Sequence, residues 1–336
     1  MKNFADRLLD LIDKMENPSV IGLDPVIEKI PNFIKEENVK KYGNTLEAAG
    51  ASIWEFNKEI IDYTYDIVGI YKPQIAFYEQ YGLPGIRAFI DTVNYIKKKE
   101  RIVIEDAKRN DIMKTAEAYA KGHIGEVTLF NGEKTPVFDV DAITVNAYLG
   151  TDSISPFVEI CKKYSKGIFI LAKTSNPSAV DFQDIMTDIK DWQKSLLHQK
   201  GIEVSEKVQN FVVIATFIYK WSEETEGSRG YRSVGAVVGA TYPQHARILR
   251  KILDKNIFLV PGYGAQGGTA EDVLQCFNED GYGAIISSSS GIIYAYQNKK
   301  WKDKFSEDEF GNAARAAALE MKNDIITALK RRYVSW

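Results

Sequence analysis

The chain has 336 residues, 45% of them hydrophobic and 26% charged, a composition that excludes a disordered, fibrous or low-complexity protein. Its 43 lysine and arginine residues are balanced by 46 aspartate and glutamate residues, so no basic excess is available to bind nucleic acid or an anionic membrane. The two cysteines, Cys161 and Cys276, stand apart, and no apolar stretch is long enough to cross a bilayer. We therefore expect a cytoplasmic protein without a structural metal site or a membrane segment.

Short apolar runs rich in β-forming residues recur along the chain, and each ends in polar or glycine-containing residues. They are the segments 19–23, 67–71, 102–104, 142–145, 167–171, 234–238, 257–260 and 284–286. Apolar residues at helical spacing lie between most of them, in the segments 46–65, 85–98, 156–164, 243–253 and 270–278. This repeat of strand, polar end and helix predicts an α/β protein with a (β/α)8 TIM barrel.

A doubly wound open sheet is the main alternative to the barrel. Such a sheet concentrates its site at one switch point, where a nucleotide-binding chain often carries a GxGxxG motif. This chain has no GxGxxG after its first strand, and polar residues follow nearly every strand. The pattern favours the barrel, in which all strand ends meet at one mouth.

Three segments do not fit the repeat. Segment 123–140 contains Asn131-Gly132 between β-rich runs and predicts an inserted hairpin. The polar segment 199–232 predicts a surface insertion. Segment 301–336 predicts a C-terminal helical extension, with its helix over about 307–332. We expect a single barrel domain over 1–336 that carries these additions.

Charged residues are densest directly after the third predicted strand, from Glu105 to Asp111. In an extended segment Asp106 and Lys108 point the same way, and Lys72 ends the preceding strand. A lysine held between carboxylates stays protonated and can act as a general acid toward a developing carbanion. A DxKxxD run alone is also typical of a solvated charged surface or an ordinary salt-bridge network. Its place at a strand end favours a catalytic array.

A glycine-rich segment, Pro261 to Thr269, follows the seventh predicted strand. Backbone N–H groups in such a loop can approach an anion, and the loops after strands seven and eight are the usual phosphate site of a barrel. A tight turn that needs left-handed residues is the alternative. Among the other strand ends, Asp24 can accept hydrogen bonds from sugar hydroxyls, segment 173–176 can read an amide or imide edge, and Asn146 can pack or bind.

Seven stretches of the chain, taken in order, resemble the orotidine 5′-phosphate decarboxylase family in its longer, type 2 branch of some bacteria and malaria-type parasites. They are IGLDP, YKPQIAFYEQYG, IEDAKRNDI, TVNAYLGTDS, LAKTSNPS, VVGAT and LVPGYGAQGG. The last of them ends at Gly268, and the resemblance as a whole extends from about residue 20 to residue 296. The resemblance implies a (β/α)8 barrel that works as a homodimer. It also implies conversion of orotidine 5′-monophosphate to uridine 5′-monophosphate and carbon dioxide, the last step of de novo pyrimidine biosynthesis, with no metal or organic cofactor.

The resemblance assigns a catalytic tetrad to Lys72, Asp106, Lys108 and Asp111. It implies that Lys108 protonates C6 after carbon dioxide leaves and that Asp106 lies beside the departing carboxylate. Asp111 is implied to come from the partner subunit and to complete the opposite site. A carbanion with no adjacent electron sink needs strong fixed cationic stabilisation, which such a tetrad would supply.

The resemblance also implies a set of substrate-binding residues. Asp24 and Lys72 would hold the ribose, Thr115 would reach a ribose hydroxyl across the dimer, Ser175 would bond the pyrimidine amide edge, and Gln266 would bridge base and phosphate. The full implied set is Asp24, Gln74, Thr115, Asn146, Ser175, Gly264, Gln266, Ser289 and Ser290, with no metal ligand.

The chain departs from the family pattern after the eighth predicted strand. The family usually has Asn-Ser-Ser-Arg-Gly there, whereas this chain has four serines followed by Gly291, with Ser290 at the position of the arginine. Serine hydroxyls and backbone amides bind phosphate without the full charge of a guanidinium group. Two alternatives follow: another basic residue replaces the arginine, or phosphate binding is weakened or altered.

Three other functions compete with this interpretation. Mg²⁺-dependent sugar-phosphate decarboxylases and hexulose-phosphate synthases also resemble DxKxxD, but they need an acidic ligand at the second strand end, where this chain has Lys72. A Schiff-base aldolase needs a lysine of lowered pKa, and nearby carboxylates oppose that. A catalytically impaired nucleotide-binding homologue is suggested by Ser290.

Overall fold

The strands of the predicted barrel are present in the computed structural model, which describes residues 2–264 and 267–333. Among these residues, eight strands form a closed barrel in the order β1-β12-β11-β10-β7-β6-β3-β2. They are β1 (Ser19–Leu23), β2 (Ile70–Pro73), β3 (Ile102–Arg109), β6 (Ala142–Val145), β7 (Gly167–Lys173), β10 (Arg232–Val238), β11 (Asn256–Pro261) and β12 (Ala284–Ser288). The (β/α)8 prediction is confirmed.

The chain divides into two compact units, which we describe separately. The first unit comprises Met1–Asp10, Lys108–Ile286 and Thr327–Trp336, and the second unit comprises Leu11–Ala107 and Ser287–Ile326. Within residues 2–264 and 267–333, no helix combines the length and the hydropathy that a bilayer crossing requires.

In the second unit, β1, β2 and β3 pair in parallel, with Val20 opposite Ile70 and Ile70 opposite Ile102. Every residue of β1 and β2 is buried, as expected for strands covered on both faces. Its helices and short 3-10 segments are α2 (Asn32–Tyr42), α3 (Leu46–Thr64), α4 (Ala76–Glu79), α5 (Gly82–Lys98), α13 (Ser290–Ile293), η1 (Ile27–Lys29), η5 (Ala295–Gln297) and η6 (Glu307–Glu309). Strand β2 begins three residues later than segment 67–71 predicts, because the N–H groups of Ile67 and Val68 close a turn on the Thr64 carbonyl.

In the first unit, β7 pairs in parallel with β6 and β10, and β10 pairs with β11. Its helices are α6 (Met113–Ile124), α7 (Thr151–Tyr164), α8 (Val180–Gln183), α9 (Asp191–Gln199), α10 (Asn210–Ser222), α11 (Pro243–Ile252) and α12 (Ala270–Val273). The terminal helices α1 (Phe4–Met15) and α14 (Phe310–Arg332) each contribute residues to both units. The predicted C-terminal helix is confirmed by α14.

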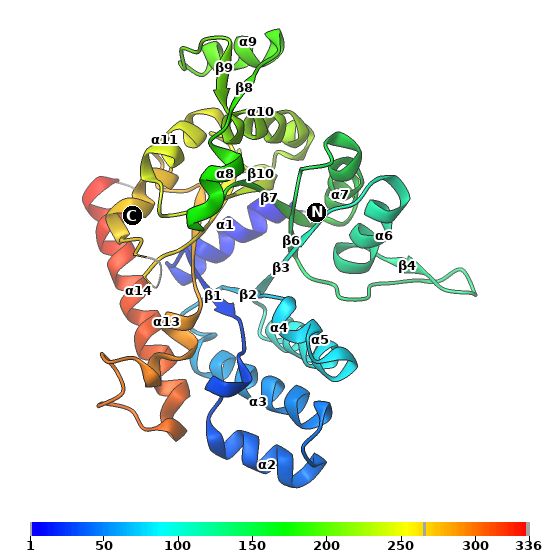
Figure 1. Ribbon diagram of the computed structural model, residues 1–336, viewed down its shortest axis with the longest axis vertical. Coiled ribbons are helices and arrows are strands. Elements are labelled where there is room, and N and C mark those ends of the chain that lie inside the picture. Colours follow the sequence, from blue (N-terminus) through cyan, green and yellow to red (C-terminus); the bar gives the residue numbers. More distant parts are fainter. Residues whose placement is uncertain (1, 265–266, 334–336) are drawn as a thin grey trace. The chain divides into compact units, whose positions relative to one another are not determined.

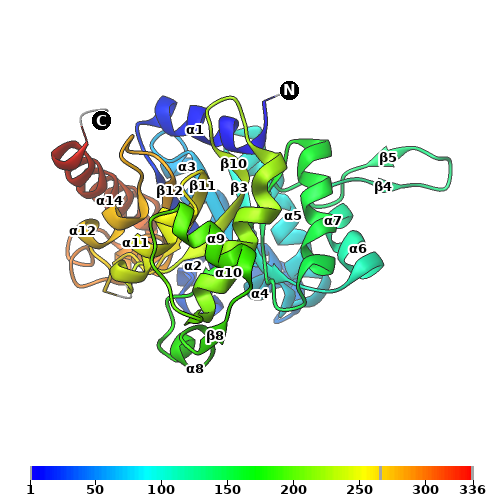
Figure 2. The same ribbon diagram turned by 90° about the horizontal axis from the view of Figure 1, so that it is seen from above.

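The predicted hairpin is confirmed by β4 (Val127–Thr128) and β5 (Lys134–Thr135), which pair antiparallel. Gly132 in its turn has a φ of 87°, a left-handed conformation that glycine adopts at little cost. The hairpin projects away from α6 and α7 (Figures 1 and 2).

The predicted surface insertion over 199–232 is corrected by the structure. The excursion starts earlier, as an antiparallel pair of β8 (Met186–Asp188) and β9 (Lys207–Gln209) with α9 between them. Residues 210–222 instead form α10, whose side chains at Phe211 and Ile218 are fully buried. The acidic run 223–226 after α10 gave the segment a polar composition. The β-branched and aromatic residues of α10 occur without a clear helical spacing, so the helix was not predicted.

Arg250 of α11 organises the packing around β11 in the first unit. Its guanidinium lies 3.6 Å from the centre of the Phe258 ring, and burial lowers the pKa of this group to about 10. It donates hydrogen bonds of 2.6 to 2.9 Å to the carbonyl oxygens of Leu253, Asn256, Cys276 and Gly283. One buried guanidinium thus donates to four backbone carbonyls that are spread over residues 253–283 of the sequence.

We predict that Arg250→Met lowers the free energy of unfolding by at least about 3 kcal/mol, because it removes four buried hydrogen bonds from a charged donor. Urea denaturation followed by circular dichroism measures this change. Lys251→Met, at the exposed neighbouring position, is the matched control and should change stability by less than about 0.5 kcal/mol. Equal urea midpoints for the two variants would contradict this account of Arg250.

Candidate active site

Lys72 and Asp106 form a buried ion pair in the second unit. Lys72 lies at the end of β2, and its Nζ donates to Asp106 Oδ2 at 2.9 Å. Their side chains are only 7% and 14% exposed. The parallel register of β2 and β3, continued by a bridge between Gln74 and Asp106, brings the two strand ends together. The expected proximity of Lys72 and Asp106 is therefore confirmed.

The environment of Lys72 keeps its ammonium group charged. Burial alone would lower the pKa of Lys72, but the charges of Asp106 and Asp24 and the hydrogen bond to Asp106 outweigh this and raise the pKa above its ordinary value. Asp24 is half-buried and directly follows β1, the strand next to β2. Its negative charge therefore raises the pKa of Lys72 from the neighbouring strand end. The group therefore presents a fixed cation between two acidic residues at neutral pH.

Two more predicted residues of the second unit take part in local structure. The backbone N–H of Gln74 donates to Leu23 O at 3.3 Å, and its side-chain Oε1 accepts from Ala76 N at 3.2 Å. Ser289 Oγ donates to Gly22 O at 3.3 Å, and a Cβ at Gly22 would lie only 2.6 Å from Ser289 Cβ. Only glycine at position 22 permits this close approach.

Ser290 is the first residue of α13, and its side chain is exposed. Within the second unit, Lys72 therefore forms an ion pair with Asp106 and interacts electrostatically with Asp24. The same unit places Gln74, Ser289 and Ser290 in the segments that follow β2 and β12.

Lys108 lies in the first unit and has an unusual backbone conformation. Its φ is 50°, in the left-handed region, although β3 continues to Arg109. Its N–H donates to Thr144 Oγ1 of β6 at 2.9 Å, and its side chain is exposed. The expectation of an extended backbone is therefore wrong at Lys108. Non-glycine residues in this conformation cluster at functional sites, where the surrounding structure compensates for the strain.

The strain at Lys108 is directly measurable. We predict that the free energy of unfolding of Lys108→Gly is about 1 kcal/mol higher than that of Lys108→Ala, because glycine adopts a positive φ without the steric penalty of a Cβ. Urea denaturation of the two variants gives the difference. The same pair at Lys121, which lies within helix α6, is the control, and there glycine should be less stable than alanine. Equal stability of the two Lys108 variants would remove the evidence for strain.

Asp111 and Thr115 flank the start of α6 in the first unit. Asp111 is half-buried, and its Oδ1 accepts from the N–H of Ile112 at 2.7 Å. Thr115 is exposed in the first turn of the helix. Asn146 follows β6, and its Oδ1 accepts from Tyr148 N at 2.9 Å. Its side chain therefore holds its own loop, as the packing alternative for this residue predicts.

The glycine-rich loop after β11 has the geometry of a tight turn. Gly262, Gly264 and Gly267 have φ values of 100°, 72° and 88°. The N–H groups of Gly264, Gly267 and Gly268 all donate to carbonyl oxygens within the loop. These three donors are therefore committed to the turn. Gln266 lies outside the described residues.

Residues 51–301 match the family model described as "Orotidine 5'-phosphate decarboxylase / HUMPS family". This match covers more than half of the chain, and it includes the Lys72–Asp106 pair. The chain belongs to this family. Its class of activity is that of a decarboxylase, a carboxy-lyase.

Full-length relatives of this family are similar to the chain from end to end. The orotidine 5′-phosphate decarboxylase of Caldicellulosiruptor bescii is 38% identical over 98% of this chain and 100% of its own length. That of Petrotoga mobilis is 40% identical over 95% of this chain and 97% of its own length. The solved structure of Leishmania donovani OMP decarboxylase is 25% identical, covers 98% of this chain and 99% of that chain, and has a TM-score of 0.68.

Sequence reasoning missed two residues next to the predicted Ser175 loop of this decarboxylase-family chain. Asp184 accepts a 2.6 Å hydrogen bond from Lys173 Nζ, and Gln183 exchanges two hydrogen bonds with Thr174. Both residues come from the region of α8, for which no element was predicted. The only signal in the sequence was Lys173 itself, because a lysine at the end of a buried strand needs an acidic partner.

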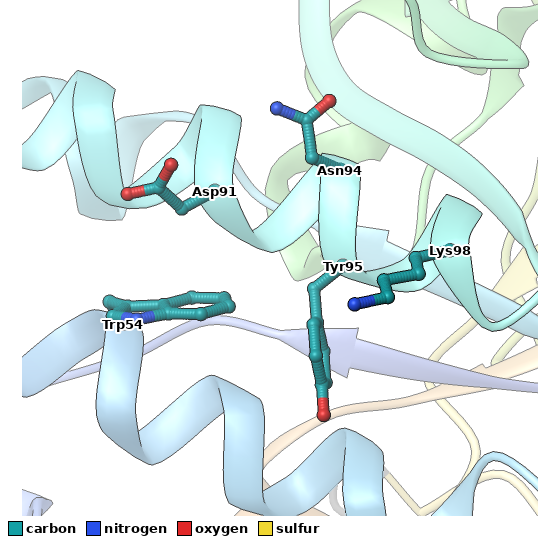
Figure 3. A pocket seen from close by; sticks show the side chains of 5 residues that line it. All are labelled: Trp54, Asp91, Asn94, Tyr95 and Lys98. Carbon is teal, nitrogen blue, oxygen red and sulfur yellow. The ribbon is translucent and has the colours of Figure 1, made fainter.

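Two hollows on the second unit do not include any predicted site residue. One, of about 390 Å³, is lined by Trp54 of α3 and by Asp91, Asn94, Tyr95 and Lys98 of α5 (Figure 3). The other, of about 450 Å³, adjoins it, since both include Trp54 and Asp91. In the described part of the chain, no group of three or more histidine, cysteine and acidic residues is arranged to hold a metal ion.

Proposed function

We propose that this chain decarboxylates orotidine 5′-monophosphate to uridine 5′-monophosphate and carbon dioxide, the last step of pyrimidine biosynthesis. The observation that carries the proposal is the buried Lys72–Asp106 pair in a chain whose full-length relatives are orotidine 5′-phosphate decarboxylases. A Mg²⁺-dependent sister enzyme would need an acidic ligand at the end of the second strand, where Lys72 instead stays protonated. The Schiff-base alternative is also disfavoured, because the pKa of Lys72 is raised rather than lowered.

The reaction breaks the bond between C6 of the pyrimidine and its carboxylate. Carbon dioxide leaves, and the electron pair stays on C6, where no adjacent group can accept it. Fixed cations are then the main source of stabilisation, and Lys108 provides one of them. Its ammonium group transfers a proton to C6, and the neutral amine regains a proton from water. Asp106 lies beside the departing carboxylate, and Lys72 holds Asp106 through their ion pair.

The remaining contacts orient the nucleotide. Asp24 and Thr115 bind ribose hydroxyls, and Ser175 bonds the amide edge of the pyrimidine. The loops that contain Gly264, Gln266, Ser289 and Ser290 bind the phosphate through donors other than the N–H groups of Gly264, Gly267 and Gly268, which the turn uses. Gln74 and Asn146 contribute by fixing their loops, since their side-chain oxygens already accept hydrogen bonds from Ala76 and Tyr148. Phosphate binding far from C6 supplies free energy that orients the base for reaction.

The working form is a homodimer with shared sites, in which Asp111 and Thr115 enter the site of the partner subunit. Large apolar side chains near these residues support this arrangement. Ile112 and Met113 are 48% and 68% exposed, and Tyr148 and Leu149 are 73% and 45% exposed. The two loops are neighbours, because Asn146 N donates to Arg109 O at 3.0 Å. Contiguous exposed apolar side chains are typical of an interface.

We also infer that residues 1–336 act as a single barrel domain, since the closed strand order includes strands of both units. We also propose that the protein acts in the cytoplasm, as the sequence composition predicts.

The test is a spectroscopic decarboxylase assay on orotidine 5′-monophosphate with and without EDTA. We expect the same turnover in both conditions, because the proposed chemistry uses only protein side chains. Loss of turnover with EDTA, restored by Mg²⁺, would support the metal-dependent alternative. Binding of uridine 5′-monophosphate without any turnover of the substrate would support the impaired homologue.

The serine at position 290 gives a separate prediction about phosphate binding. Ser290→Arg restores the family's guanidinium group, and we expect KM for orotidine 5′-monophosphate to fall about tenfold, the effect of one added charge-assisted hydrogen bond. Turnover at saturation should change little, because the phosphate is remote from C6. Ser290→Gln, of similar length but neutral, is the control. If all three proteins have the same KM, another basic residue already holds the phosphate.

A further inference from the structure

Lys173, the last residue of β7, has a fully buried charge in the first unit. Its side chain has no exposed surface, and its Nζ lies 4.5 Å from the centre of the Tyr242 ring and 5.7 Å from that of Phe211. The Nζ donates to Asp184 Oδ1 at 2.6 Å, and the Asp184 side chain is 26% exposed. Asp184 directly follows α8. The ion pair therefore joins the end of a barrel strand to the far end of the loop 174–184.

Stability alone does not explain a lysine at this place. Taking an ammonium group out of water costs free energy that an ion pair often does not recover, and an apolar residue of similar size would pack against Tyr242 and Phe211 without that cost. A buried ion pair does, however, select one arrangement of the segments it joins, because any other arrangement leaves a buried charge without a partner. Lys173 therefore restricts the loop 174–184 to the conformation that presents Asp184.

A second contact closes the same loop. The side-chain amide of Gln183 accepts from Thr174 N at 2.9 Å and donates to Thr174 Oγ1 at 2.7 Å. Thr174 Oγ1 in turn donates to Asn176 Oδ1 at 2.7 Å. Two adjacent residues at the start of the loop thus bond two adjacent residues at its end. This double closure fixes the segment between them more tightly than either contact would alone.

Ser175 lies inside this closed loop, and the segment that follows β10 also contacts its backbone. Thr241 Oγ1 donates to Ser175 O at 3.3 Å. A Cβ at Gly239 would lie 2.8 Å from Ser175 Cα, so a larger residue there would displace the serine backbone. The backbone of Ser175 is therefore set by its own loop on one side and by the segment after β10 on the other.

We propose that Lys173 is a positioning residue that acts on Ser175 through its ion pair with Asp184. The pair fixes the loop 174–184 before substrate arrives, so that the Ser175 hydroxyl meets the pyrimidine amide edge without a further ordering cost. This inference rests on the proposed function for the role of Ser175. The pair itself is defined by the contacts of Lys173 and Asp184.

Kinetics of single and double variants test the proposal. Lys173→Met removes the charge and keeps a long apolar side chain, and Ser175→Ala removes the hydroxyl that the loop positions. We expect each to lower kcat/KM for orotidine 5′-monophosphate by about tenfold or more, equivalent to about 1.4 kcal/mol. The double variant should lose no more than Ser175→Ala alone, because both changes act through the same hydroxyl. Losses that multiply in the double variant would overturn the proposal.

Two further variants keep the buried lysine, so the test survives if Lys173→Met fails to fold. Asp184→Asn and Gln183→Ala each weaken one closure of the loop, and both should lower kcat/KM in the same direction as Ser175→Ala. Lys194→Met is the matched control. It removes the ion pair of Lys194 with Glu206, which has an Nζ to Oε2 distance of 2.7 Å and lies in the excursion that follows this loop. Its kinetics should equal those of the unaltered protein.

Hydrogen exchange of the peptide 174–184 provides a readout that needs no activity. We expect Lys173→Met and Asp184→Asn to speed exchange there at least about tenfold, and Lys194→Met to leave it unchanged. Unchanged exchange in Lys173→Met would overturn the positioning role whatever the enzyme does. Absence of turnover in the unaltered protein would instead overturn the proposed function, and faster exchange in the variants would then still support the ion pair as the closure of the loop.

Discussion

Replacing Lys108 with alanine should abolish decarboxylation and leave the fold intact. The variant loses both the proton donor for C6 and a cation fixed near the developing carbanion. General acid catalysis contributes about 10² to 10⁴-fold and a preorganised electrostatic group about 10² to 10³-fold, so we expect kcat to fall by at least about 10⁴-fold. The fold should persist because the Lys108 side chain is exposed, and its N–H bond to Thr144 does not depend on the side chain.

The measurement is kcat and KM from the spectroscopic assay, together with a urea unfolding curve. Lys163→Ala is the matched control, since Lys163 is an exposed lysine of α7 with no part in the proposed site. It should keep the turnover of the unaltered protein. A Lys108→Ala variant that keeps near-normal kcat would show that another group protonates C6, and the assignment of the acid would then be wrong.

The barrel was predictable because its strands carry a simple physical signal. Strands buried on both faces have uninterrupted apolar runs, as 142–145 and 234–238 show, and both runs are strands in the structure. The Lys72–Asp106 pair was predictable for the same reason. Once two parallel strands are neighbours and in register, polar residues at their ends lie together, and opposite charges then pair.

The features that escaped prediction depend on contacts distant in sequence or on backbone conformation. The φ of 50° at Lys108 could not be predicted, because glycine is the usual sequence signal of a positive φ and position 108 is a lysine. Helix α10 is apolar around most of its surface, so no polar face revealed its period. Asp184 pairs with Lys173 only because the α8 loop folds back on β7, and nothing in the spacing of the two residues predicts that return.

Mixing two inactive variants should restore activity if the sites are shared between subunits. Lys108→Ala and Asp111→Asn are each expected to be inactive, because each removes one charge from the tetrad. In a hybrid dimer, one site contains both substitutions. The other site is intact, because it takes Lys108 from the Asp111→Asn chain and Asp111 from the Lys108→Ala chain. With random exchange of subunits, we expect about a quarter of the normal turnover. The assay after co-refolding of an equimolar mixture measures the recovery.

The matched control mixes Lys108→Ala with Asp106→Asn. Because Asp106 and Lys108 are proposed to serve the same site, both sites of that hybrid carry a substitution, and no activity should return. Differently tagged chains that are purified together establish that exchange has occurred. Absence of recovery in the Lys108→Ala and Asp111→Asn mixture, despite such exchange, would mean that Asp111 acts within its own subunit. The exposed Ile112 and Met113 would then need another explanation than an interface that surrounds a shared site.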